Sequence, residues 1–104
     1  MSHVTEVVVF RLQDGVDEAD FLKSAQATFD LLQSYDGYIN RELSVSDDGV
    51  WVDVVTWADK ATALQAAEAI MSDPIGQAFG GKIALESAQM HHVHPRISHM
   101  PATP

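Results

Sequence analysis

The sequence predicts an α+β fold in which two strand–helix–strand units share one four-stranded antiparallel sheet. A β-branched and aromatic run at residues 50–57 follows a tight turn and leads directly into an amphipathic helix. A second run rich in β-branched residues, 4–12, opens the chain and also precedes a helix. Each helix is followed by a further strand, so the expected order is strand, helix, strand, strand, helix, strand.

The strand at residues 50–57 is the most strongly patterned segment of the chain. Asp48-Gly49 precedes it and is expected to supply the two positive-φ residues that a tight hairpin needs. One face of the strand carries Val50, Val52, Val54 and Thr56, and the other carries Trp51, Asp53, Val55 and Trp57. Because Asp53 is the one fully polar side chain among them, both faces of this strand need to be covered.

Residues 4–12 form the other strand that is apolar on both faces. Asp17 then stands as the expected N-cap of a helix, with acidic residues in the first turn, where the helix dipole favours them. The apolar stripe of this helix consists of Phe21, Ala25, Thr28, Phe29 and Leu32. Asp36-Gly37 is expected to end the helix, with Gly37 in the left-handed conformation.

Two further strands complete the predicted sheet. The segment from Tyr38 to Ser46 alternates like an edge strand. One of its faces carries Ile39, Arg41, Leu43 and Val45, and the other carries Tyr38, Asn40, Glu42 and Ser44. The last strand is expected over about 82–94.

Asp59 is the expected N-cap of a second helix from Lys60 to about Met71. Ser72-Asp73-Pro74 restarts the chain, because proline fits a first helical turn, and one further short helical turn is expected there. Residues 95–104 are expected to form a tail, since prolines recur in it at positions 95, 101 and 104.

These elements predict a ferredoxin-like βαββαβ topology. Right-handed crossovers would place the first and third strands in the middle of the sheet and both helices on one face. The opposite face would then stay bare, with valines on both middle strands. An exposed apolar patch of that kind normally marks an interface, so a homodimer is expected.

The composition narrows the classes of function. With 104 residues, 46% of them hydrophobic, the chain fits a single domain, with its core at about 4–94. Fifteen acidic and six basic residues give a net charge of −9, which argues against nucleic acid and membrane partners. The absence of cysteine excludes disulfides and thiolate chemistry. Residues 1–6 lack the features of a secretory signal, so a cytoplasmic protein is expected.

Three motifs resemble those of a known family. They are Tyr35-Asp36-Gly37-Tyr38, Trp57-Ala58-Asp59-Lys60-Ala61-Thr62-Ala63 and Ser72-Asp73-Pro74. Together with the topology, they make residues 4–94 similar to the dimeric α+β barrels, and within them to the antibiotic biosynthesis monooxygenase-like proteins. The resemblance implies a dimeric α+β barrel, and the superfamily includes small cofactor-independent oxygenases and haem-degrading enzymes.

The resemblance also implies a site between the helices and the sheet, where the family's tryptophan corresponds to Trp57. Asp53 points to the same side as Trp57, at a position where such enzymes carry a neutral amide, so its carboxylate is a departure from the family pattern. Haem-degrading relatives carry an axial histidine in the second helix region. Residues 73–81 contain no histidine, so haem is disfavoured and no cofactor is expected.

We therefore take Asp53 and Trp57 as candidate catalytic residues, and Trp51, Trp57 and Phe29 as candidate substrate-binding residues. The alternative is structural: the tryptophans simply fill the core, and Asp53 makes a hydrogen bond to a helix start. Asp53 and Trp57 are expected to line one cleft beneath the helices, and Asp53→Asn should then be tolerated or even stabilising, since it removes a charge from a site of low dielectric. Glu6 is expected near solvent, and Tyr38, Asn40 and Arg41 are expected in surface or dimer contacts.

A cluster of histidines lies at the end of the last predicted strand. His91, His92 and His94 stand together, and His3 would approach them across the first and last strands. Imidazole is a common metal ligand, but no cysteine or third carboxylate accompanies the histidines. No specific metal site is expected.

Two functions follow from these features. The leading one is a small cofactor-independent monooxygenase, in which the cleft desolvates the enolate or phenolate of a flat aromatic or quinone-like substrate for reaction with dioxygen. Asp53 or a histidine would move the proton. The alternative is a non-catalytic dimeric α+β barrel that acts in a stress response or binds a ligand.

Overall fold

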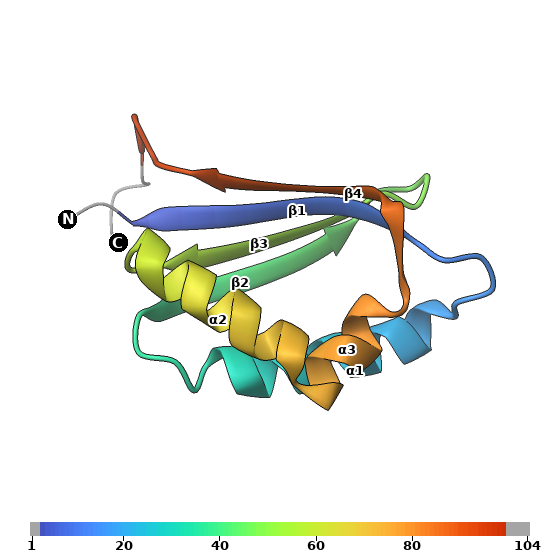
Figure 1. Ribbon diagram of the computed structural model, residues 1–104. Helices are drawn as coiled ribbons and strands as arrows, with labels where there is room; N and C mark the ends of the chain where they lie inside the picture. The colour runs from blue at the N-terminus through green and yellow to red at the C-terminus, as the bar shows by residue number, and fades with distance from the viewer. Residues whose placement is uncertain (1–2, 100–104) are drawn as a thin grey trace, which may run out of the picture.

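The computed structural model describes residues 3–99, and Pro101 and Pro104 of the expected tail lie outside them. Its elements are β1 (Val4–Leu12), α1 (Glu18–Leu32), β2 (Tyr38–Val45), β3 (Trp51–Trp57), α2 (Lys60–Ser72), α3 (Pro74–Gly80) and β4 (Ile83–Val93) (Figure 1). The predicted ferredoxin-like order is confirmed, with the expected short turn formed as α3. No helix within residues 3–99 is long and apolar enough to cross a membrane.

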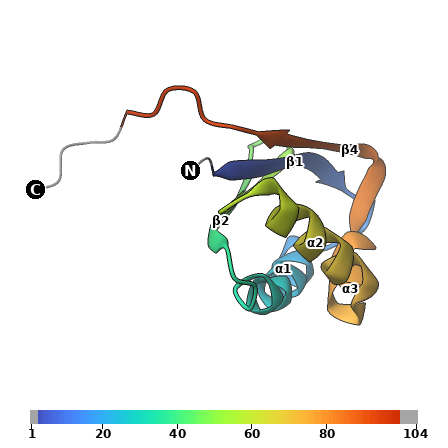
Figure 2. The same cartoon turned by 60° about the vertical axis from the view of Figure 1, so that its left-hand side comes forward.

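The four strands form one antiparallel sheet in the order β2-β3-β1-β4. The first and third strands are central, as predicted. All three helices lie on one face of the sheet, which Figures 1 and 2 show from two directions. After β4 the chain runs away from this body, and residues 94–99 are exposed (Figure 2).

Each helix begins at an aspartate whose side chain accepts a backbone hydrogen bond from the first turn. The pairs are Asp17 with the Asp20 N–H at 3.2 Å, Asp59 with the Thr62 N–H at 2.8 Å, and Asp73 with the Ile75 N–H at 2.9 Å. Pro74 follows its cap at the first helical position, where its missing N–H costs nothing. The first two caps are those predicted from the sequence.

The end of α1 differs from the prediction. The helix ends at Leu32, and Gln33 caps it by donating its backbone N–H to the Phe29 carbonyl at 3.0 Å. Gly37 does take a positive φ of 95°, but it lies in the turn that leads into β2. A Cβ there would lie 3.0 Å from the Thr62 side chain, so this glycine also lets the turn pack closely against α2.

The hairpin between β2 and β3 is also longer than predicted. Only Gly49 has a positive φ, of 84°, and Asp48 does not. The Gly49 N–H donates to the Ser46 carbonyl at 3.1 Å, and the Ser46 N–H donates to the Val50 carbonyl at 2.9 Å. This pattern is typical of a type I turn closed by a left-handed glycine rather than of a two-residue turn.

An irregularity in β2 changes which side chains face the helices. The pairing of β2 with β3 shifts between Tyr38 and Asn40, so Tyr38 and Arg41 fall on the same face of the sheet. Tyr38 packs edge-on against Trp57, with ring centroids 5.9 Å apart. The expected surface or dimer role is therefore wrong for Tyr38 and Arg41, while Asn40 is exposed.

The core beneath the helices consists of two clusters. One surrounds Trp57 and includes Val4, Leu32, Val55, Ala63 and Ala66. The other surrounds Trp51 and includes Phe10, Phe21 and Ile83. Along the helix-facing side of β3, Asp53 stands between the two tryptophans, so the apolar core is interrupted in the middle of the sheet.

The other face of the sheet carries no helix (Figures 1 and 2). Val7 and Val9 of β1 lie opposite Val54 and Val52 of β3 on this face. All four are only half-buried within the single chain. The apolar face predicted from the alternation of the two middle strands is therefore present and uncovered in this chain.

Candidate functional site

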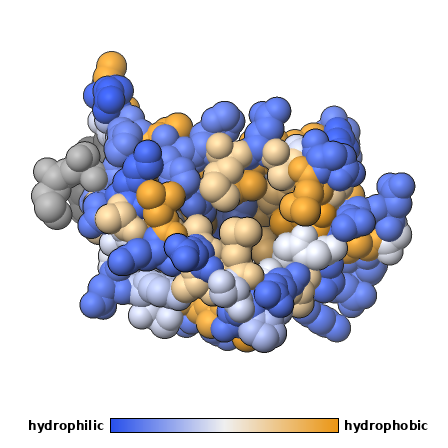
Figure 3. Space-filling view, viewed as in Figure 1, coloured by the Kyte–Doolittle hydropathy of each residue, from blue (hydrophilic) through white to orange (hydrophobic). Residues whose placement is uncertain are grey.

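A cavity of about 320 Å³ lies between the sheet and helices α2 and α3. Its walls are mostly apolar, with Ile70 and Phe79 from the helices and Met90 from β4. In the space-filling view, apolar side chains gather around a hollow in the middle of the face between β4 and the two helices (Figure 3). The ionisable groups of the cavity, Glu6, Arg41 and Asp53, come from three neighbouring strands.

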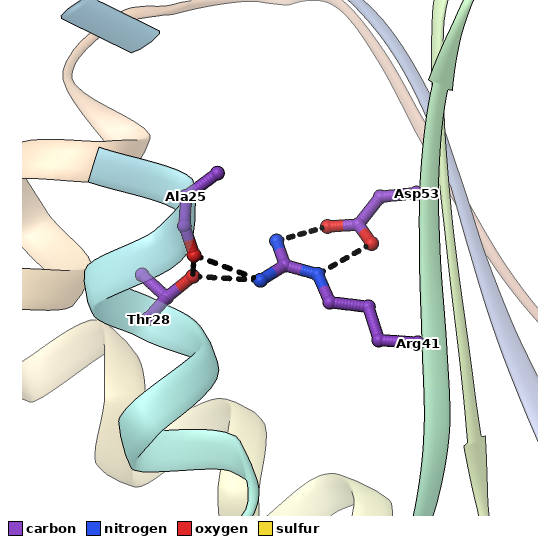
Figure 4. Close-up of polar contacts among 4 residues, drawn as sticks. All are labelled: Ala25, Thr28, Arg41 and Asp53. Atoms are coloured by element: carbon purple, nitrogen blue, oxygen red, sulfur yellow. Dashed lines mark hydrogen bonds and ion pairs between the residues drawn. The ribbon is translucent and has the colours of Figure 1, made fainter. Parts of the chain in front are cut away.

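Arg41 and Asp53 form a buried ion pair at this wall (Figure 4). The Arg41 Nε donates to Asp53 Oδ1 at 3.0 Å and Nη2 donates to Oδ2 at 2.8 Å, so both carboxylate oxygens are occupied. The two side chains are 8% and 10% exposed. A bidentate pair of this geometry satisfies both charges, which is why a carboxylate is tolerated in the middle of a sheet.

Helix α1 completes the environment of the guanidinium. The Arg41 Nη1 donates to the Ala25 carbonyl at 3.0 Å and to Thr28 Oγ1 at 2.9 Å (Figure 4). On another side, the Arg41 guanidinium carbon lies 5.5 Å from the centroid of the Phe79 ring, within cation–π range. The Arg41 side chain, which comes from β2, thus contacts both α1 and α3.

A second polar pair lies on the neighbouring strands. Glu6 of β1 is opposite His92 of β4, and Glu6 Oε2 lies 3.0 Å from His92 Nε2. The two side chains are 13% and 15% exposed. Burial raises the pKa of Glu6 above its ordinary value, and the Asp53 charge adds to this, while His92 opposes it.

Of the four residues proposed from the sequence, only Asp53 lies in the cavity wall. Trp57 and Trp51 are 1% and 4% exposed and belong to the two core clusters. Phe29 lines a separate open groove of about 460 Å³ between α1 and β2, and Arg41 lies between that groove and the cavity. The catalytic and binding roles assigned to these residues stay predictions.

Trp57 has one unusual property for a core residue. Its indole N–H is buried and has no hydrogen-bond partner within residues 3–99. The ring contacts Tyr35 and Tyr38 edge-on, at centroid distances of 6.5 and 5.9 Å. Trp57 thus lies next to the turn before β2 and packs with the alanines of α2, and it is not one of the residues that line the cavity.

Sequence reasoning missed Glu6 and Arg41. Glu6 was expected near solvent, but its partner strand and its position on the helix-facing side of β1 bury most of the side chain. The signal was available, because Glu6 alternates with Val8 and Phe10 on one face of a central strand. For Arg41 the signal was incomplete, since the contact with Asp53 needs the β2–β3 register.

The other histidines lie apart from this site. His3, His91, His94 and His99 are exposed, and β4 ends at Val93, before His94. Among residues 3–99, no three His, Cys, Asp or Glu side chains are grouped so as to hold a metal ion. The expectation that the histidines form no specific metal site stays a prediction.

No protein-family model and no curated protein matches this chain. Solved structures do. A variant of SnoaB from Streptomyces nogalater, a cofactor-independent oxygenase, has a TM-score of 0.76 at 16% identity, over 94% of this chain and 97% of that one. A candidate antibiotic biosynthesis monooxygenase from Bordetella bronchiseptica has a TM-score of 0.77 at 20% identity, over 93% and 100%.

A third similar structure is a dimeric ferredoxin-like protein of unknown function from Jannaschia. Its TM-score is 0.66 at 13% identity, over 88% of this chain and 97% of that one. The predicted resemblance is therefore confirmed at the level of the fold, which this chain has in common with antibiotic biosynthesis monooxygenase-like proteins. Identities this low carry no information about the reaction, so function has to be argued from the cavity.

Proposed function

We propose that this chain is a small oxygenase that binds a flat, largely apolar ring compound in the cavity and lets it react directly with dioxygen. The observation that carries the proposal is the cavity itself, which combines apolar walls with ionisable side chains on one side. The same fold in SnoaB, a cofactor-independent oxygenase, supports it. In this proposal the reaction uses neither a metal nor an organic cofactor.

The chemistry needs a substrate that can give up a proton and then electrons. Removing a proton from a ring CH₂ group leaves a carbanion stabilised by the aromatic system. Electron transfer to dioxygen and formation of a C–O bond then give a hydroperoxide, which loses water to leave a carbonyl. The balance is one CH₂ and one O₂ to one C=O and one H₂O. A cavity that excludes bulk water favours the first step when a base is held beside the substrate.

We propose roles for two residues that differ from those suggested by the sequence. Asp53 has both carboxylate oxygens on Arg41, so we propose that it holds the guanidinium at the cavity wall rather than moving a proton. Trp57 lies in the neighbouring core cluster, where we propose that it fixes the position of β3 under α2.

Anthrone is a suitable first substrate, because its oxidation by this chemistry gives anthraquinone and water. We expect oxygen uptake above the spontaneous rate, with one O₂ consumed per quinone formed. Ala67→Phe should lower the rate roughly tenfold or more, equivalent to about 1.4 kcal/mol, because it fills the cavity from α2. Ala69→Phe, exposed on the same helix, is the matched control and should leave the rate unchanged. Equal rates in both variants would place the reaction elsewhere.

A second candidate function is ligand binding without turnover. The observation in its favour is that the ionisable groups of the cavity are already paired with one another, Arg41 with Asp53 and Glu6 with His92. A ligand-sequestering protein would show protection against thermal unfolding by ring compounds and no oxygen uptake with any of them. The anthrone experiment therefore separates the two functions.

We also propose that two copies of this chain pair through the open face of the sheet. The half-buried valines at positions 7, 9, 52 and 54 support this, as does the dimeric state of the Jannaschia protein. Val54→Asp is expected to convert a dimer into a monomer or unfold it, because it puts a charge into the apolar face. Sedimentation velocity at micromolar concentration measures this. Ile97→Asp, which is 80% exposed, is the control, and a wild-type monomer would contradict the proposal.

A further inference from the structure

We propose that Glu6, held in place by His92, is the group that takes the proton from the bound compound, and that the cavity therefore selects a neutral ring compound with one weakly acidic O–H or C–H. This inference rests on the proposed function, because it concerns the first step of the same reaction in the same cavity. It adds a base and a substrate class that the fold comparison does not supply.

The geometry leaves one oxygen of Glu6 available. Glu6 lines the cavity, and its Oε2 is engaged by His92 Nε2 at 3.0 Å. Its Oε1 has no hydrogen-bond partner within residues 3–99. When Glu6 is ionised, this bond requires the proton to be on Nε2 of His92, so the imidazole donates to Oε2 and orients the carboxylate. The free oxygen can then accept a proton from a ligand.

The other carboxylate of the cavity is a poorer acceptor. Both oxygens of Asp53 receive hydrogen bonds from the positively charged Arg41 guanidinium. Protonating Asp53 would break a bidentate bond and leave Arg41 buried beside a neutral acid. A proton added to Oε1 of Glu6 displaces no hydrogen bond, because Oε1 has no partner within the described residues.

The surroundings of Glu6 make it a stronger base than an exposed glutamate. The charged or titratable groups that face it are His92 from β4 and Asp53 from β3, and Arg41 of β2 lies beyond Asp53. The helices across the cavity present apolar side chains such as Ile70 and Phe79. Burial is the largest of these influences and raises the pKa of Glu6, which brings it closer to the pKa of a weakly acidic substrate.

Charge balance favours a neutral ligand. An anionic ligand would be placed beside the carboxylates of Glu6 and Asp53, with Arg41 already neutralised by the latter. With a neutral ligand, the O–H or C–H bond breaks, its electron pair stays on the ligand, and the proton bonds to Glu6 Oε1. The negative charge moves from Glu6 to the substrate, so the net charge of the cavity does not change. The proton held by Glu6 is later transferred to the oxygen that leaves as water.

Fluorescence of bound 2-naphthol tests this assignment without any oxygenation. This flat phenol becomes a strong acid in its excited state, and its neutral and ionised forms emit at different wavelengths. Bound to the wild-type protein, it should transfer its proton to Glu6 and emit as naphtholate. In Glu6→Gln we expect at least a tenfold loss of naphtholate emission at equal occupancy, because the amide cannot accept the proton. 2-Methoxynaphthalene has no such proton and reports occupancy alone.

The pH dependence of naphtholate emission is a second measurement, and it does not require the Glu6→Gln variant to fold. Naphtholate emission from the wild type should rise with pH as Glu6 ionises, with a midpoint above that of an ordinary glutamate, because the pKa of Glu6 is raised. In His92→Gln the carboxylate remains but loses the opposing influence of the histidine, so the midpoint should move to higher pH. A midpoint unchanged in His92→Gln would overturn the positioning role of His92.

The outcomes separate the base from the oxygenase. Bound 2-naphthol that emits only from its neutral form, or that emits equally as naphtholate in Glu6→Gln, overturns the base and leaves the oxygenase proposal standing. Naphtholate emission that depends on Glu6, together with no oxygen uptake on anthrone, keeps the base and overturns the oxygenase. Failure of 2-naphthol and 2-methoxynaphthalene to bind overturns both, since each proposal places a flat ring compound in this cavity.

Discussion

Arg41→Met is expected to lower the free energy of unfolding by about 3 kcal/mol, because removing one partner of a buried ion pair leaves the other charge uncompensated. Asp53 is buried, and both of its carboxylate oxygens are bonded to Arg41. The substitution also removes the two hydrogen bonds from Nη1 to α1. Urea denaturation followed by tryptophan fluorescence measures the change. Asp53→Asn should destabilise in the same direction, which reverses the expectation drawn from the sequence.

Arg11→Met is the matched control for this prediction. The Arg11 Nη2 lies 3.8 Å from Asp48 Oδ2, but the two side chains are 52% and 76% exposed. Exposed ion pairs contribute about 0–1 kcal/mol, so the control should be close to wild type. The double variant Arg41→Met with Asp53→Leu should recover much of the loss, since neither charge of the pair is then left without its partner. An Arg41→Met protein as stable as Arg11→Met would show that the pair at the cavity is solvated.

The fold could be predicted because its signals are local. Asp17 and Asp59 cap their helices within three residues of their own positions, and the alternation of β3 assigns each side chain to a face. Neither signal requires knowledge of the partner strand. The two errors, at Gly37 and Asp48, concern turns, where one glycine fits several turn geometries.

The site could be predicted only in part, because its contacts depend on register. Arg41 meets Asp53 because the β2–β3 register places Arg41 opposite Val55, two positions along the same face from Asp53. Glu6 and His92 form the second pair, although they are 86 residues apart in the chain. The alternation of each strand shows the face of a side chain but not the residue that lies opposite to it.

The separation of Asp53 from Trp57 has a related cause. Both point to the helices from β3, as predicted, but the helices do not cover them equally. Ala63 and Ala66 of α2 pack in the cluster of Trp57 and close the space there. Beside Asp53, the chain passes from α2 to α3, and Gly76 and Phe79 line an opening instead. Which part of a strand face is filled depends on packing of the helices, which periodicity alone does not define.

This junction between α2 and α3 leads to the second large effect. Gly76→Ala is expected to lower the free energy of unfolding by about 3 kcal/mol, because overpacking that has to move backbone lies at the upper end of its usual cost. A Cβ at Gly76 would overlap the Ile70 carbonyl oxygen and lie 2.7 Å from Ile70 Cγ2. Helix α3 would have to move away from the end of α2. Urea denaturation measures the loss, and weaker binding of 2-naphthol should accompany it, since Gly76 and Ile70 both line the cavity.

Gly80→Ala, in the same helix, separates this contact from the general effect of replacing a helical glycine. A Cβ at Gly80 would meet no atom within 4 Å. Alanine is favoured over glycine in a helix by up to about 1 kcal/mol, so Gly80→Ala should be neutral or slightly stabilising. The same gain at position 76 is outweighed by the clash with Ile70. If the two variants prove equally stable, α3 does not pack against α2 as closely as the structure shows, and the wall of the cavity at this junction would have to be redrawn.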